Sequence, residues 1–251
     1  MSFAAFASRL AEAAREVTLA AAERTVEDKS KGGSFDPVTD ADREAELAMR
    51  ALIEAEYPAH GINGEEHAAR PARCAYQWSL DPIDGTRAFI CGLPSWATLI
   101  ALLEEGEPIL GVIDAARLDE LYLGDGKHAW LNGAPIRTSA CRTLAEARLS
   151  TTDPFLFGAV EGMRFERLRE KARVTRYGLD AYGYARLAAG QIDLVAESGL
   201  KPHDWQALVP VIRGAGGVVG DWQGGADLSA GQILAAATPE LFAAAVAVLA
   251  D

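Results

Sequence analysis

Apolar residues recur at helical spacing in the first quarter of the chain. Over residues 2–26 they lie near a period of 3.6, which predicts an amphipathic helix. The apolar face of this helix consists of Phe3, Phe6, Leu10, Val17, Ala20 and Ala21. A second helix is predicted over about 41–56, and Pro58 ends it. Between the two, the polar and glycine-bearing residues 29–36 predict a loop.

The pattern changes after residue 60. Short apolar runs bounded by turn signals predict an antiparallel meander, with strands at 76–80, 97–103, 109–113, 120–123 and 128–131. After about residue 145, strand patterns alternate with helical ones, which is typical of βα units. The predicted strands there are 148–151, 174–177, 192–196, 218–221 and 233–236, and the predicted helices are 161–172, 180–189, 204–215 and 239–250.

These patterns predict a single domain over residues 1–251 with two lobes. The first lobe, about 1–145, is α+β and rich in antiparallel strands, and the second, about 146–251, is α/β. A chain of 251 residues suits one large domain or two interlocked lobes. It contains no internal repeat and no low-complexity linker that would separate independent units.

Charge narrows the classes of partner. Lys and Arg number 24 and Asp and Glu number 36, so the formal net charge is −12. An anionic surface repels a phosphate backbone, which argues against a nucleic-acid partner. A small phosphate substrate is still compatible with this charge, because bound metal ions reverse the local field.

The cysteines and the N-terminal helix indicate a cytoplasmic protein. Cys74, Cys91 and Cys141 form no disulfide framework and no zinc-binding pair, so a reducing compartment is expected. The first helix carries charges inside its apolar pattern, unlike a signal peptide. No run reaches about 18 apolar residues, so no membrane partner is expected.

The segment Trp-Ser-Leu-Asp-Pro-Ile-Asp-Gly-Thr, residues 78–86, is the most informative for chemistry. Asp81 and Asp84 stand three residues apart at the end of an apolar strand and can converge on one point. Two carboxylates held close together repel each other unless protons or cations lie between them. Oxygen ligands of this kind suit Mg²⁺ or Mn²⁺. An ordinary acidic turn is the alternative, since turns favour Asp and Gly.

Three other acidic segments are weak signals when each is taken alone. Residues 36–42 (DPVTDAD) and the segment around Asp204 (PHDW) also fit helix N-terminal caps. The segment Gly64-Glu65-Glu66 also fits a solvated loop.

The order and spelling of these segments are specific. DPVTDAD, GEE, WSLDPIDGT and HDW followed by GAGG resemble the inositol monophosphatase family, from the first helix to the last. The resemblance implies a layered α-β-α-β-α sandwich and hydrolysis of small phosphomonoesters. It also implies two or three Mg²⁺ ions per site, with Mn²⁺ as a substitute, and a homodimer.

The resemblance assigns roles to particular residues. Glu65 would bind the catalytic metal and contact the attacking water, and Asp81 would bridge two metals. Ile83 would offer its backbone carbonyl, while Asp84 and Asp204 would hold the second metal. Asp42 would orient the hydroxyl of Thr86, which helps to position the water. The backbone N–H groups of Gly85 and Thr86 would face the phosphate.

The leaving-group pocket is expected to involve Gly178, Leu179, Asp180, Arg186, Glu197 and Asp204. Asp180 and Glu197 would suit a cationic substrate. Asp180 also fits a helix N-cap, and Arg186 also fits a surface or interface cation.

The segments between the motifs resemble the histidinol-phosphatase branch. They are RAFI, GLPSW and TLIAL after the signature, then LAAGQID and GLKP. The expected activity is hydrolysis of L-histidinol phosphate in histidine biosynthesis, by direct attack of a metal-activated water. The alternatives are a phosphatase for inositol 1-phosphate or other sugar or nucleotide phosphates, and a regulatory binding protein that keeps the fold.

Overall fold

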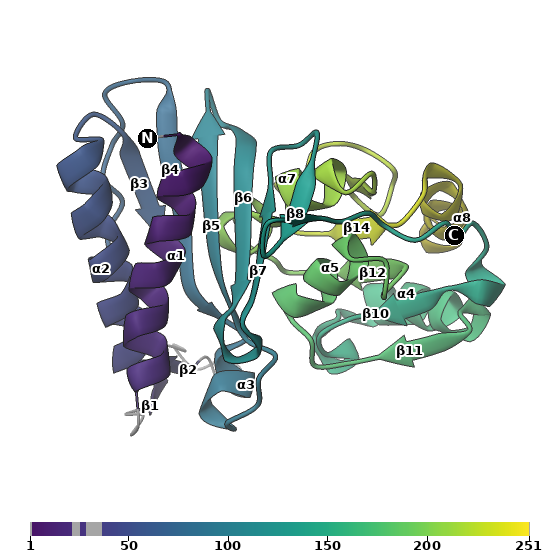
Figure 1. Cartoon of the computed structure of the whole chain (residues 1–251). Helices are drawn as coiled ribbons and strands as arrows, with labels where there is room; N and C mark the ends of the chain where they lie inside the picture. Colours follow the sequence, from purple (N-terminus) through teal and green to yellow (C-terminus); the bar gives the residue numbers. More distant parts are fainter. Residues whose placement is uncertain (1, 22–25, 29–36, 251) are drawn as a thin grey trace.

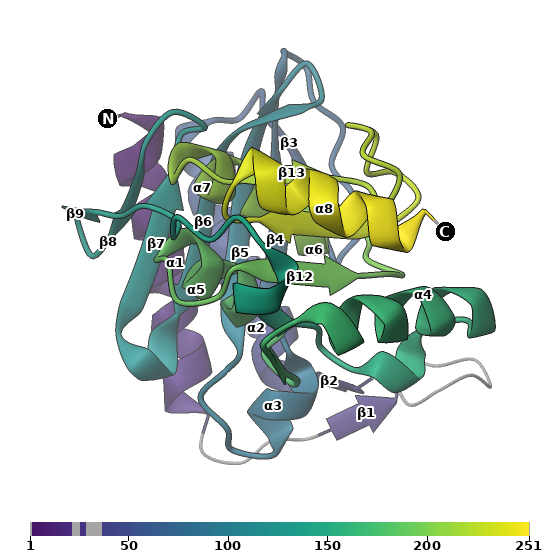
Figure 2. The same cartoon turned by 90° about the vertical axis from the view of Figure 1, so that its right-hand side faces the viewer.

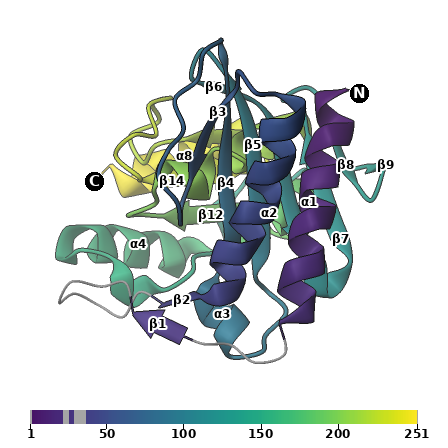
Figure 3. The ribbon, with the colours of Figure 1, turned by 90° about the vertical axis from the view of Figure 1, so that its left-hand side faces the viewer.

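Two N-terminal helices cover one face of a large sheet. The structure, a computed structural model, describes residues 2–21, 26–28 and 37–250, so the predicted loop at 29–36 lies outside the described residues. Helix α1 (Phe3–Ala20) is shorter than predicted, and α2 (Asp40–Glu56) matches its prediction closely. Figure 3 shows the two helices side by side over the sheet. Their buried faces contribute Phe6, Leu10, Met49 and Ile53 to one hydrophobic cluster with Trp78 and Ile100 of the sheet.

The larger sheet has seven strands in the order β3-β4-β5-β6-β7-β8-β9. The strands are β3 (Gly61–Gly64), β4 (Tyr76–Asp84), β5 (Ala97–Glu104), β6 (Glu107–Ala115), β7 (Glu120–Gly124), β8 (Ala129–Leu131) and β9 (Ala134–Pro135). The antiparallel meander is confirmed from β4 to β9. The prediction missed β3, which pairs parallel with β4. Its sequence Gly-Ile-Asn-Gly has low strand propensity, and pairing with β4 overrides that preference.

The smaller sheet has five strands in the order β11-β10-β12-β14-β13. The strands are β10 (Arg148–Ser150), β11 (Val174–Arg176), β12 (Leu194–Glu197), β13 (Val218–Gly220) and β14 (Ile233–Ala236). The βα pattern holds for β10, β11 and β12, of which β10 pairs parallel with the other two. Strand β14 is antiparallel to both neighbours, because no helix separates it from β13 in the chain.

Helices fill the space between the sheets and cover the outer face of the smaller one. The inner helices are α5 (Ala181–Ala188) and α7 (Leu208–Gly214), and the outer ones are α4 (Ala159–Lys171) and α8 (Pro239–Leu249). One cluster joins Leu99 of the larger sheet, Val211 of α7 and Val195 of the smaller sheet, and another joins the outer helices to that sheet. Figures 1 and 2 show the resulting layers, with α4 and α8 outermost. The predicted α-β-α-β-α sandwich is confirmed.

Three short elements complete the surroundings of the site. Strands β1 (Val26–Asp28) and β2 (Pro37–Thr39) pair antiparallel, and α3 (Thr86–Ile90) follows β4 directly.

The helix predicted over 204–215 is divided into α6 (Pro202–Trp205) and α7. Pro210 has no N–H to donate to the carbonyl of Gln206, which weakens helical continuity there. Helix α6 lies against β4 and β5. Among the described helices, none is long and apolar enough to cross a membrane.

Candidate metal and phosphate site

A bulge in β4 turns Asp81 and Asp84 toward the same side. Asp81 pairs with Leu99 and Asp84 with Ala97, so β4 carries one extra residue over this stretch. In a regular strand, residues three apart point to opposite faces, and the extra residue cancels that alternation. Pro82 suits a bulge because it cannot donate to the strand ladder. Its carbonyl accepts a 2.7 Å hydrogen bond from the Thr98 hydroxyl.

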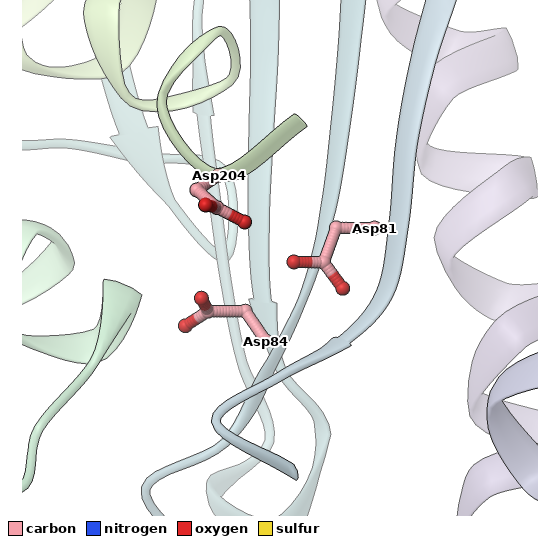
Figure 4. Close-up of side chains that lie close together, drawn as sticks. All are labelled: Asp81, Asp84 and Asp204. Atoms are coloured by element: carbon pink, nitrogen blue, oxygen red, sulfur yellow. The ribbon is translucent and has the colours of Figure 1, made fainter. Parts of the chain in front are cut away.

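Asp204, in the second lobe, lies close to this bulge. It lies on α6, and its carboxylate accepts a 2.6 Å hydrogen bond from the backbone N–H of Lys201 at the start of that helix. The packing of α6 on β4 places Asp204 beside Asp81 and Asp84, and one oxygen from each carboxylate lies within 4.8 Å of the others. Figure 4 shows the three side chains converging from the two elements.

The surroundings of the three carboxylates disfavour their ionised forms. Burial raises the pKa of Asp81, and the charges of Glu65 and Asp84 raise it further. Burial raises the pKa of Asp84, followed by the charges of Asp180 and Asp204. Burial is also the largest cause of the raised pKa of Asp204. Magnesium binds oxygen ligands at about 2.1 Å, so oxygens on opposite sides of one ion are roughly 4.2 Å apart. The spacing and chemistry of the cluster therefore fit a divalent cation.

Glu65 stands next to this cluster. Its backbone N–H donates to the carbonyl of Leu80 at 3.1 Å, which places it at the end of β3 beside the bulge. Its charge raises the pKa of Asp81, Asp84 and Asp204, although it is not one of the three that share the 4.8 Å cluster. The structure thus brings the four predicted acidic metal ligands to one place.

A buried glutamate on α2 holds the loop that carries Glu65. Glu46 accepts a 2.7 Å hydrogen bond from the backbone N–H of Glu66 and a 2.6 Å hydrogen bond from Arg50. Gly64 packs directly on Glu46, and a Cβ at that position would lie 2.0 Å from a carboxylate oxygen. The sequence analysis missed Glu46, although it lies one helical turn after Asp42 and faces the same side.

Asp42 and Thr86 have other partners than predicted. The carboxylate of Asp42 accepts hydrogen bonds from the backbone and hydroxyl of Thr39, at 2.8 and 2.5 Å. The hydroxyl of Thr86 donates to the carbonyl of Ile83 at 3.0 Å. The predicted Asp42–Thr86 pair is therefore not formed in the structure, because the local capping geometry satisfies both groups. Burial, and then the charges of Glu66 and Glu65, raise the pKa of Asp42 to about 6.

A cavity of about 290 Å³ opens beside the acidic cluster. Its acidic lining residues are Glu65, Asp84, Asp153, Asp180, Glu197 and Asp204, and its basic ones are Arg87 and Lys201. Gly85 and Thr86 line it as predicted. Gly85 has φ +82°, a backbone conformation that favours glycine, and a Cβ there would make a tight 3.0 Å contact with a carboxylate oxygen of Asp180.

Two carboxylates of the second lobe, the buried Glu197 and the half-buried Asp180, line the cavity. Glu197, 6% exposed, accepts hydrogen bonds from the backbone and hydroxyl of Thr152 and from the hydroxyl of Thr151, at 2.6, 2.9 and 3.2 Å. Burial nevertheless raises its pKa to about 8. Burial raises the pKa of Asp180 to about 6, although the charge of Arg87 opposes this.

Three predicted substrate residues lie elsewhere. Arg186 points toward β7, where it lies 3.4 Å from Glu120 and 3.3 Å from the hydroxyl of Tyr122. It therefore corresponds to the alternative of a surface cation rather than to a cavity residue. Gly178 and Leu179 are absent from the described cavity lining. The N–H of Gly178, in the bend that follows β11, instead donates to the carbonyl of Thr152 at 2.8 Å.

The lining residues that were not predicted include Arg87, Thr152, Tyr184 and Lys201. Arg87 directly follows the signature, and Lys201 starts the helix of Asp204, so their proximity to known motifs was an available signal. Thr152 and Tyr184 had no such signal, because only packing of the second lobe orients them toward the cavity.

The chain is similar to known proteins over nearly its whole length. Residues 2–251 match the inositol monophosphatase family. The chain is 47% identical over 225 residues to the bifunctional phosphatase IMPL2, chloroplastic, of Arabidopsis thaliana, covering 88% of this chain and 65% of the plant protein. It is 36% identical over 203 residues to a histidinol-phosphatase of Chlorobaculum parvum, covering 80% and 78% of the two chains.

A solved structure extends the similarity to the fold. The inositol monophosphatase from Zymomonas mobilis superimposes with a TM-score of 0.87 at 39% identity, covering 98% of this chain and 97% of that one. The layered fold, the order of the acidic motifs and the full-length match lead to one conclusion. The chain belongs to the inositol monophosphatase family, whose members are in general metal-dependent phosphatases.

Proposed function

We propose that this protein is a Mg²⁺-dependent phosphomonoesterase that hydrolyses L-histidinol phosphate to L-histidinol and phosphate. The observation that carries the proposal is a three-carboxylate cluster beside a cavity whose lining contains two more carboxylates, the half-buried Asp180 and the buried Glu197. The first group suits metal-assisted phosphoryl chemistry, and the second suits a leaving group with positive charge.

Asp81, Asp84 and Asp204 would hold the metal, with Glu65 and the carbonyl of Ile83 as further ligands. When bound, Mg²⁺ neutralises charge on the phosphoryl oxygens and lowers the pKa of water, and Mn²⁺ offers similar chemistry. The carbonyl of Ile83 already accepts one hydrogen bond from Thr86 and has a second lone pair for a ligand.

The chain's own groups would orient the reactants. Glu65, beside the cluster, would accept a proton from the attacking water, and the hydroxyl of Thr86 would fix the direction of that water. The N–H groups of Gly85 and Thr86, at the start of α3, would donate to the phosphate. Phosphoryl transfer depends mainly on such positioning and charge stabilisation, so direct attack by water needs no phosphoenzyme.

The leaving-group side favours histidinol over a neutral polyol. Histidinol carries an ammonium group, and Asp180 and Glu197 supply carboxylates for it. With its pKa near 8, Glu197 holds a proton at neutral pH in the free cavity. An adjacent ammonium would favour the ionised carboxylate. A cationic leaving group would therefore offset the unfavourable free energy of burying Glu197 as an anion.

A substrate panel tests the proposal. Phosphate release would be measured from histidinol phosphate, inositol 1-phosphate and 3′-phosphoadenosine 5′-phosphate, with Mg²⁺ and with EDTA. We expect kcat/KM to be highest for histidinol phosphate and release to stop in EDTA. A preference for inositol 1-phosphate would reject the substrate, and undiminished release in EDTA would reject the metal.

An inositol phosphatase is the second candidate, and similarity to the Zymomonas mobilis enzyme favours it. A regulatory binding protein is less well supported, because the four acidic residues of the site are all present and adjacent. We also propose that the protein is cytoplasmic and forms a homodimer. Light scattering coupled to gel filtration would test the homodimer.

A further inference from the structure

Tyr184 is a cavity residue whose hydroxyl has no role in the fold. It lies on α5, is 2% exposed and lines the cavity. Its hydroxyl makes no hydrogen bond to any described residue. The hydroxyl of Tyr182, on the same helix, instead donates to Glu120 at 3.1 Å.

The surroundings of this hydroxyl are acidic. Burial, and then the charges of Glu197, Asp84 and Asp204, raise the pKa of Tyr184 well above 10. The phenol therefore stays protonated at all physiological pH values, with a proton to donate and lone pairs to accept. A buried hydroxyl without a partner destabilises a fold, so the contact that offsets this cost is expected to come from a ligand.

The position of Tyr184 indicates which part of a ligand it meets. Two of the carboxylates that act on it, Asp84 and Asp204, belong to the metal cluster, and the third, Glu197, belongs to the leaving-group wall. Tyr184 is therefore close to both groups, and its hydroxyl would meet a ligand in the interval between the metal cluster and Glu197. The first carbon atoms of the leaving alcohol occupy that interval if the proposed function holds.

We propose that Tyr184 determines specificity by contacting a polar group on the carbon next to the phosphate-bearing carbon. Its oxygen accepts a hydrogen bond from the substrate's ammonium or hydroxyl group. This inference rests on the proposed function for the orientation of the substrate, and it extends to any leaving alcohol with a vicinal donor.

Matched substrates isolate this contact. Wild-type and Tyr184→Phe enzymes would be compared on histidinol phosphate and on its des-amino analogue, 3-(imidazol-4-yl)propyl phosphate. We expect kcat/KM for histidinol phosphate to fall by about 10-fold in the variant, the effect of one lost hydrogen bond. The value for the des-amino analogue should stay within about 2-fold.

Tyr182→Phe is the matched control, because it removes a hydroxyl from the same helix outside the cavity and should leave both substrates unaffected. The Tm of Tyr184→Phe should equal or exceed that of wild type, which a structural role for the hydroxyl would not allow. Equal losses on both substrates, or no loss on either, would overturn the proposal.

Failure of the proposed function would look different. If wild-type enzyme prefers inositol 1-phosphate, the same comparison is made with inositol 1-phosphate and cyclohexyl phosphate. A selective loss on inositol 1-phosphate would then support Tyr184 while rejecting histidinol phosphate as substrate. A loss shared by both of these compounds would reject Tyr184 as well.

Discussion

Asp193 and Asp81 are buried to the same extent, 1% and 2% exposed, but their surroundings are opposite. Arg148 donates to both oxygens of Asp193, at 2.7 and 2.6 Å, and Ser139 adds a further hydrogen bond. Burial alone would raise the pKa of Asp193, but these donors outweigh it and lower the pKa. Asp81 faces other carboxylates, and its pKa is raised by burial and by their charges.

The comparison distinguishes carboxylates that serve the fold from carboxylates that serve a ligand. A buried anion without a compensating cation costs several kcal/mol. At Asp193 the chain supplies that cation itself, whereas at Asp81 and Asp84 a ligand has to supply it. The second lobe repeats the contrast within the cavity, because Glu197 has three donors but no cation among the residues that the structure describes.

Asp84→Asn should have the largest effect on activity. Losing one charge from the cluster should lower kcat by roughly 10³-fold, the scale of a lost electrostatic contact in a transition state. The amide oxygen can still accept the hydrogen bond that Asp84 receives from the backbone of Ala181, so the fold should persist. Steady-state kinetics and a thermal melt in EDTA would measure both, with Tm equal to or above wild type. Near-full activity in saturating Mg²⁺ would contradict the metal assignment.

Thr86→Ala should also act on turnover rather than on stability. Removing its hydroxyl is expected to lower kcat by roughly 10²-fold or more, the scale of a positioned proton-transfer group. Thr86→Ser keeps the hydroxyl and should recover most of the rate. Ser139 donates to Asp193, away from the cavity, so Ser139→Ala should lower Tm and leave kcat unchanged. A lower Tm for Thr86→Ala together with a lower kcat for Ser139→Ala would contradict the distinction between the two regions.

Asp193→Asn should mainly reduce stability. It removes the anion that Arg148 and Ser139 bind, and unpairing one member of a buried ion pair costs about 3–5 kcal/mol. The side chain of Arg148 is 39% exposed, so water compensates part of this loss and about 2 kcal/mol is expected. Urea denaturation would measure the change in the free energy of unfolding. A kcat reduced as strongly as in Asp84→Asn would show that the two regions are not separate.

The smallest expected effect is on the pH dependence of stability. The pKa of Glu197 is near 8 in the fold, above its ordinary value of 4.5. The folded state therefore binds this proton more tightly than the unfolded state does. The contribution of Glu197 to the free energy of unfolding is fully present below pH 4.5 and is lost as the pH rises through 8. Between pH 6.5 and 8 the free energy of unfolding in EDTA should fall by roughly 1–2 kcal/mol through this group.

Glu197→Gln provides the control for this titration. The variant cannot lose a proton at this position, so its stability should change less between pH 6.5 and 8 than that of wild type. Urea denaturation of both proteins at the two pH values would measure the difference. Identical pH dependence would show that Glu197 is not the group responsible.

Most elements of the fold were predictable because their residues repeat at helical or strand spacing. The exceptions depended on partners: β3 exists because β4 supplies its hydrogen bonds, and β14 runs antiparallel because a loop precedes it. Proximity of the acidic motifs followed from their resemblance to a family. The orientation of Arg186 toward Glu120 could not be predicted, since helical spacing alone does not show which neighbour a long side chain meets.

The amino-acid sequence by itself determined the chemistry of this protein: an excess of carboxylates, a strand that ends in Asp-Pro-Ile-Asp-Gly, and helices that begin with acidic caps. Only the tertiary structure decided which of those groups meet. Asp204 lies 120 positions from Asp84 along the chain, and packing of α6 on β4 and β5 brings them together. Packing also left the hydroxyl of Tyr184 unpaired beside them, because the partners of a buried side chain depend on every element around it.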